Sequence, residues 1–189
     1  MAGALASMSA FSEAPIRQIE QEAIAAYLNT LDPEQPAAKI LVIEQTTATA
    51  DEAFVATDPQ RERLVKDLPQ ATGKVIDDFL RVSATPSELR VPGQLVRRNV
   101  RLQMVRKKDM DRLFDLGKPS LAWARFYELY PDAAGLVQIS RVGIDESAAQ
   151  ALFYMSIRQG GLRGSGHFVL LHRPFGIWRV LATAKAWIS

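Results

Sequence analysis

Four strand-like runs in the last third of the chain place the strongest constraint on its fold. They cover residues 135–144, 149–158, 166–173 and 177–189, and each is rich in β-branched, aromatic or other apolar residues. The separators DESA, QGGLRGS and PFG are short and contain turn-forming residues. Because connections this short allow only antiparallel neighbours, the runs predict an antiparallel meander.

The preceding two thirds of the chain favour helices. Ile19, Ala23 and Tyr27 follow the three-four spacing of an amphipathic helix. Helices before a sheet are typical of the α+β class, so we expect N-terminal helices on one face of a C-terminal antiparallel sheet of about four to five strands. The expected elements of this part are helices at 15–31, 60–83 (in two pieces), 108–117 and 119–132, and strands at 39–47 and 99–107.

The length and composition fit one domain. With 189 residues, we expect a single α+β domain over 15–189, preceded by a flexible tail or signal-peptide remnant over 1–14. The chain has no cysteine, which excludes disulfides and Cys-ligated metal sites. No apolar run approaches the ~18 residues that cross a bilayer. His167 and His172 are five apart on one strand and point to opposite faces, so we expect no metal or other cofactor.

Charge is unevenly distributed along the chain. Residues 1–60 carry nine acidic and two basic residues, a net charge of −7, whereas residues 61–189 carry 12 acidic and 21 basic residues, a net charge of +9. Two interpretations stay open: a polyanion-binding half, or two segments that pack together, which we prefer. The basic stretch 97–108 makes a weak nucleic-acid binder the sharper alternative, but it contains no aromatic residue to stack a base.

The glycine-rich stretch 159–167, QGGLRGSGH, lies between two of the strand-like runs. Its glycine spacing fits neither the dinucleotide fingerprint nor the phosphate-binding P-loop, and it leads into a strand instead of a helix. We therefore expect a hairpin connection whose glycines supply positive φ angles or a bulge. The functional alternative is an anion held by loop N–H groups beside Arg163.

The aromatic residues Trp123, Phe126, Tyr127 and Tyr130 share one face of a predicted helix. We expect this stripe to form the apolar seal between that helix and the sheet. A ligand pocket lined by the same rings is the alternative, because small-molecule pockets are mostly apolar and aromatic.

The last 67 residues resemble an uncharacterised family of small bacterial proteins, many of them secreted. The shared pattern is W-x-x-F/Y…YP…SRVG…AL-x-Y…GGL-x-G-x-G…W-x-V…W-x-S. The matching positions here are Trp123, Tyr127, Tyr130, Pro131, Gly135, Ser140, Arg141, Val142, Gly143, Ala151, Leu152, Tyr154, Gly160, Gly161, Leu162, Gly164, Gly166, Leu170, Leu171, Trp178, Val180, Trp187 and Ser189. Some relatives have cysteines where this chain has Gln159 and Arg163, so a disulfide or metal role for the loop does not carry over. The resemblance favours a periplasmic or secreted location over a cytoplasmic one and brings no established activity.

The predicted function is the binding of a partner protein or small ligand by a non-enzymatic envelope protein. Arg141 lies within a strand next to the predicted core, where an arginine either pairs with a carboxylate or binds a ligand's anionic group. The alternative is a hydrolase or isomerase in which His167 and Arg141 act as acid/base and anion holder. The candidate ligand-binding residues are Tyr130, Arg141, Tyr154, Arg163 and His167.

Overall fold

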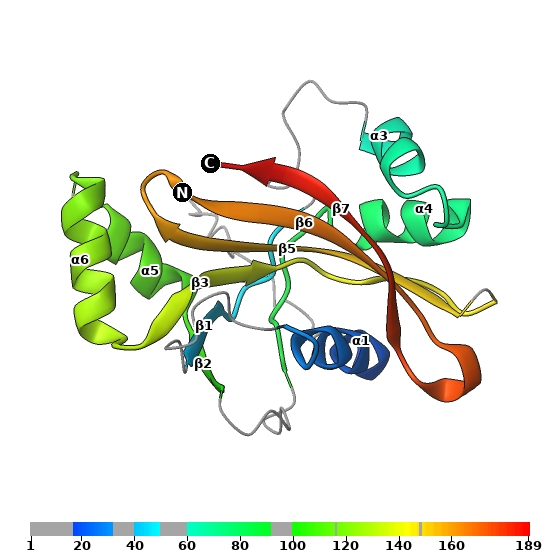
Figure 1. Cartoon of the computed structure of the whole chain (residues 1–189), viewed down its shortest axis with the longest axis horizontal. Coiled ribbons are helices and arrows are strands. Elements are labelled where there is room, and N and C mark those ends of the chain that lie inside the picture. The colour runs from blue at the N-terminus through cyan, green and yellow to red at the C-terminus, as the bar shows by residue number, and fades with distance from the viewer. Residues whose placement is uncertain (1–16, 32–39, 50–59, 92–99, 116, 148) are drawn as a thin grey trace, which may run out of the picture.

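The computed structural model describes residues 17–31, 40–49, 60–91, 100–115, 117–147 and 149–189 (Figure 1). One mixed sheet joins seven strands in the order β2-β1-β3-β5-β6-β7, with β4 paired to β5. The strands are β1 (Ile40–Glu44), β2 (Arg101–Val105), β3 (Ala133–Ile139), β4 (Gly143–Asp145), β5 (Gln150–Gly160), β6 (Arg163–His172) and β7 (Arg179–Ile188). The helices are α1 (Gln18–Leu28), α3 (Gln60–Asp67), α4 (Gly73–Val82), α5 (Lys107–Phe114) and α6 (Pro119–Leu129), with a 3₁₀ turn η1 at Pro174–Gly176.

The antiparallel part of the sheet confirms the predicted α+β class and the meander. β3, β5, β6 and β7 are antiparallel neighbours that follow one another along the chain. The first predicted run, 135–144, is divided into β3 and β4 by residues 140–142. At this break Ser140 keeps its place against β5, because its N–H donates to the Tyr154 carbonyl and its hydroxyl accepts from the Tyr154 N–H. The tail at 1–14, the connectors at 32–39 and 50–59, and residues 97–99 of the basic stretch lie outside the described residues.

Two parallel strands make the sheet larger than predicted. β1 pairs in parallel with β2 on one side and with β3 on the other. Parallel neighbours need a long crossover: the chain passes through α3 and α4 between β1 and β2, and then through α5 and α6 before it reaches β3. All five residues of β1 are buried, as expected for a strand covered on both faces.

Helices cover both faces of the sheet, so the prediction of helices on one face was wrong. α1 packs Ala23, Ile24 and Leu28 against one face. On the other face, one core cluster joins α5 and α6 to β1 and β3, and a second joins α3 and α4 to β5 and β6. Figure 1 shows these two helix pairs at opposite ends of the sheet. The alternation of apolar residues along β1, β3 and β5 supplies both layers.

The aromatic stripe of α6 is core, as predicted. Trp123 and Phe126 are buried between α6, α5 and the sheet, with Tyr127 and Tyr130 packed at their edge. The ring centroids of Trp123 and Phe126 are 5.3 Å apart in an edge-to-face arrangement, which aromatic pairs favour.

The glycine stretch forms a tight hairpin between β5 and β6. Gly160 pairs with Arg163, so only two residues make the turn, and the register shifts between Arg158 and Gly160 as a bulge does. None of its four glycines has a positive φ, so of the two expected alternatives the structure shows the bulge. Two of them instead make room for a ring: a Cβ on Gly166 would lie 2.4 Å from Trp187 Nε1, and one on Gly164 would lie 3.2 Å from Trp187 Cη2.

Candidate functional site

A polar pocket lies on the sheet face that carries both helix pairs. Its volume is about 380 Å³, at the lower end of the ~300–1,000 Å³ range of small-ligand sites. The floor comes from β1, β3, β5 and β7, and α5 forms a wall. Since β1 and β7 are four strand spacings apart in the sheet order, the floor extends over roughly 19 Å. The lining residues are Glu44, Lys107, Met110, Asp111, Phe114, Gln138, Tyr154, Arg158 and Trp187.

Glu44 is the buried acid of this pocket. It ends β1, and its side chain is only 3% exposed. Gln138 Nε2 on the neighbouring strand donates to Glu44 Oε2 at 3.1 Å. No described residue donates a hydrogen bond to Glu44 Oε1; the nearest cationic nitrogen, Arg158 Nη2, is 4.0 Å away. Burial raises the pKa of Glu44, and the Gln138 hydrogen bond and the charges of Lys107 and Arg158 offset this only in part.

The two basic residues of the pocket differ in how closely a neighbouring acid pairs with them. Lys107 Nζ lies 3.3 Å from Asp111 Oδ1 one helical turn along α5, so these two charges pair with each other. Arg158 is half-exposed, and within the described part of the chain its guanidinium has only the long contact to Glu44. Arg158 pairs in register with Leu136, and two residues along the same strands Ser156 pairs with Gln138. Because alternate residues of a strand share a face, the Arg158 side chain lies on the same face of the sheet as Gln138.

The far end of the pocket is aromatic. Trp187 Nε1 donates to the Tyr154 hydroxyl at 2.7 Å. Gly166 pairs in register with Trp187 and leaves the space that its indole occupies. The glycine pattern of β6 therefore positions a tryptophan at the pocket, which is a role that spacing rules for phosphate loops do not detect.

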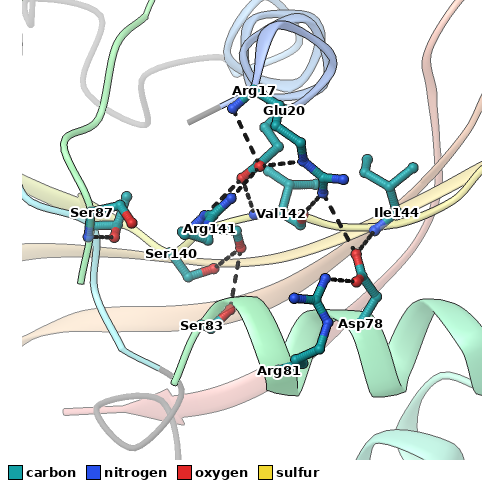
Figure 2. Close-up of polar contacts among 11 residues, drawn as sticks. Arg17, Glu20, Asp78, Arg81, Ser83, Ser87, Ser140, Arg141, Val142 and Ile144 are labelled. Carbon is teal, nitrogen blue, oxygen red and sulfur yellow. Dashed lines mark hydrogen bonds and ion pairs between the residues drawn. The ribbon is translucent and has the colours of Figure 1, made fainter. Parts of the chain in front are cut away.

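Arg141 lies away from this pocket, at the N-terminus of α1. Arg141 Nη2 donates to Glu20 Oε1 at 2.7 Å and Nε donates to Oε2 at 3.3 Å. The Val142 N–H also donates to Glu20 Oε2, and Arg17 Nε donates to Oε1 at 2.8 Å (Figure 2). Glu20 is fully buried. Burial alone would raise its pKa, but the hydrogen bonds from Arg141, Arg17 and Val142 outweigh it and hold the pKa of Glu20 below its ordinary value.

The Glu20 network continues to the opposite helical layer. Arg17 Nη2 lies 3.6 Å from Asp78 Oδ2 on α4, and that oxygen accepts from the Ile144 N–H at 2.8 Å. Arg81 forms a further ion pair with Asp78. Figure 2 shows α1 and α4 on either side of the β3–β4 segment, joined by these contacts. The arrangement ties two helices and a break in the sheet together.

Of the five predicted site residues, Tyr154 alone lines the pocket. Tyr130 lies at the end of α6 against Phe126, with their ring centroids 5.2 Å apart. Arg163 is exposed at the hairpin turn, where its charge acts on Tyr127 of α6. His167 pairs in register with Met155 and so points to the α1 side of the sheet. The structure does not bring these residues together, and their role in binding a ligand stays a prediction.

The sequence contained one signal for the residues that were missed. The predicted strand at 39–47 begins with a continuous apolar run, which is typical of a strand buried on both faces, and Glu44 directly follows this run. An acid on such a strand needs a partner or a function, because unpaired charges are rarely buried. Gln138 and Arg158 carried no such signal, since each looks like the polar residue of an ordinary strand.

Neither a family model, nor a curated protein, nor a solved structure matches this chain. Across the described ranges, no three His, Asp or Glu side chains are grouped so as to hold a metal ion. The same part of the chain contains no helix long and apolar enough to span a membrane.

Proposed function

We propose that this protein binds a small polar ligand in the pocket beside Glu44. The observation that carries the proposal is a carboxyl group almost fully removed from water, exposed to the pocket, whose Oε1 receives no hydrogen bond from a described residue. Within the described ranges, the fully enclosed side-chain atoms without a hydrogen-bond partner are Asn29 Oδ1 and Trp178 Nε1. Glu44 Oε1 is not one of them, so it stays accessible from the pocket and can accept a hydrogen bond from a ligand there.

The proposal is for binding and not for turnover. The described lining contains an acid with a raised pKa but no serine, cysteine or histidine next to it to serve as a nucleophile or second proton carrier. His167 and Arg141 are not part of this lining, so no pocket observation supports a hydrolase or isomerase built on them. The resemblance of the C-terminal third supports a periplasmic or secreted location, which completes the proposal.

Thermal unfolding with a panel of amino acids, amines, carboxylates, sugars and nucleosides tests the proposal. We expect at least one class to raise the Tm of the wild type in a saturable way, since a ligand that binds only the folded state stabilises it. The shift should disappear in Glu44→Gln and stay in Glu128→Gln, the same change at an exposed position of α6. A panel without any shift, or an equal shift in Glu44→Gln, would contradict the proposal.

A further inference from the structure

Glu44 and Arg158 are two opposite charges on the pocket floor that do not satisfy each other. Their closest N–O distance is 4.0 Å, whereas charge-assisted N–H···O bonds are about 2.7–2.9 Å long. The carboxylate is held on its other oxygen by Gln138, and the guanidinium has no hydrogen bond within the described part of the chain. Each group therefore keeps hydrogen-bonding capacity on the side that faces the pocket.

The other charged groups of the lining do not change this balance. Lys107 and Asp111 pair with each other on α5 and contribute no net charge. A ligand with only an anionic group would bring a negative charge next to Glu44, and one with only a cationic group would bring a positive charge next to Arg158. A ligand that carries a positive and a negative group close together avoids both repulsions. It also supplies a hydrogen-bond partner to both Glu44 and Arg158.

The remaining surface of the pocket is apolar and aromatic. Met110 and Phe114 come from α5, and the Trp187 ring, fixed by its bond to Tyr154, comes from β7. Such rings are suited to an apolar or aromatic side chain, and the small volume suits a ligand of amino-acid size.

We propose that the ligand is a zwitterion of the α-amino-acid type, with its ammonium group on Glu44, its carboxylate on Arg158 and its side chain against Phe114 and Trp187. This inference rests on the proposed function and specifies the chemistry of the same pocket. The ammonium group donates to Glu44 Oε1, and the planar guanidinium of Arg158 donates two parallel bonds to the ligand carboxylate.

Calorimetric titration with three matched probes tests the assignment. L-Phenylalanine carries both charges, phenethylamine lacks the carboxylate, and 3-phenylpropanoate lacks the ammonium group. We expect L-phenylalanine to bind, and each analogue to bind about tenfold or more weakly, because a charged hydrogen-bonding group of the site is then left without its partner.

Two variants assign each charge to its residue. In Glu44→Gln the advantage of L-phenylalanine over 3-phenylpropanoate should vanish, and in Arg158→Gln its advantage over phenethylamine should vanish. Glu128→Gln and Arg125→Gln, which alter an exposed ion pair on α6, should bind all three probes as the wild type does. Each variant is first compared with the wild type by circular dichroism, so that a change in binding is separated from a change in folding.

The outcomes separate the inference from the proposed function. If an analogue binds as tightly as L-phenylalanine and its binding depends on Glu44, the zwitterionic ligand is wrong, whereas the proposed binding function of the pocket is retained. The same conclusion follows if neither L-phenylalanine nor any other amino acid binds while another compound class gives a Glu44-dependent thermal shift. If no compound of either experiment binds, both the inference and the proposed function fail.

Discussion

Two buried glutamates on opposite faces of the sheet have opposite electrostatic environments. Glu20, on the α1 side, accepts hydrogen bonds from two guanidinium groups and a backbone N–H, and its pKa is lowered. Glu44, on the side of α5, accepts one amide hydrogen bond from the described residues, and burial raises its pKa. The difference shows that burial of an acid does not by itself indicate a ligand-binding site. The number of hydrogen-bond donors around its oxygens separates a structural carboxylate from one that can still accept a hydrogen bond from a ligand.

Among the variants that test this comparison, Glu20→Ala is expected to change the free energy of unfolding most. Removing the acid leaves the partly buried Arg141 without its carboxylate partner and Arg17 with its longer contact to Asp78, so the free energy of unfolding should fall by about 3 kcal/mol. Urea unfolding followed by circular dichroism measures the loss. The control is Glu22→Ala, two residues along on α1. The exposed Glu22 accepts from Gln18 alone among the residues that the structure describes, and the change should stay within about 0.5 kcal/mol. Equal losses in both variants would show that Glu20 is not a structural carboxylate.

Gly166→Ala tests the aromatic end of the Glu44 pocket. A Cβ at this position would lie 2.4 Å from Trp187 Nε1 and 2.8 Å from the Tyr154 hydroxyl. Displacing the indole should cost about 1–3 kcal/mol and weaken ligand binding. Gly161→Ala in the turn is the matched control, because the nearest atom there is Pro119 Cβ at an ordinary 3.6 Å. An unchanged Tm in Gly166→Ala would mean that the glycine does not position Trp187.

Glu44→Gln should act in the opposite direction to Glu20→Ala. The amide keeps the shape and the Gln138 contact but removes a charge that is poorly solvated, so we expect a gain of about 1 kcal/mol at neutral pH. The urea midpoint measures this gain, with Glu128→Gln as the exposed control. A loss of stability as large as that of Glu20→Ala would place Glu44 among the structural ion pairs.

The smallest expected effect is the pH dependence of this gain. Because the pKa of Glu44 is raised in the folded state, folding takes up a proton between the ordinary and the raised pKa, and stability falls as pH rises through this window. Glu20 has the opposite sign: its lowered pKa gives stability that is present above the ordinary value and is lost as pH falls through the lowered one. The difference between Glu44→Gln and wild type should therefore grow from acid to neutral pH. A constant difference would contradict the raised pKa.

Much of the fold was accessible from the sequence because it is set by local patterns. The meander and the helical pieces follow from apolar spacing and from turn residues between runs. The parallel pairing of β1 and β2, and the placement of α1 on the face opposite the other described helices, depend on long connections whose course local patterns do not determine.

The candidate site was less accessible for a similar reason. Glu44, Gln138 and Arg158 come from three strands that the register brings together, 94 and 20 residues apart along the chain. Arg141 was singled out, but its partner Glu20 is 121 residues away and looked like one more polar residue of an amphipathic helix. The sequence left open whether Arg141 pairs with a carboxylate or with the anionic group of a ligand, and the fold shows that it pairs with Glu20.

The most direct test is a titration of the glutamate carboxyl carbons by NMR, with assignment through Glu20→Gln and Glu44→Gln. We predict that Glu44 titrates above the ordinary glutamate pKa and Glu20 below it. Addition of a bound zwitterionic ligand should move the Glu44 pKa downwards and leave that of Glu20 in place, because an ammonium group beside the carboxylate favours its charged form. A Glu44 pKa at or below that of Glu20 in the free protein would contradict the account.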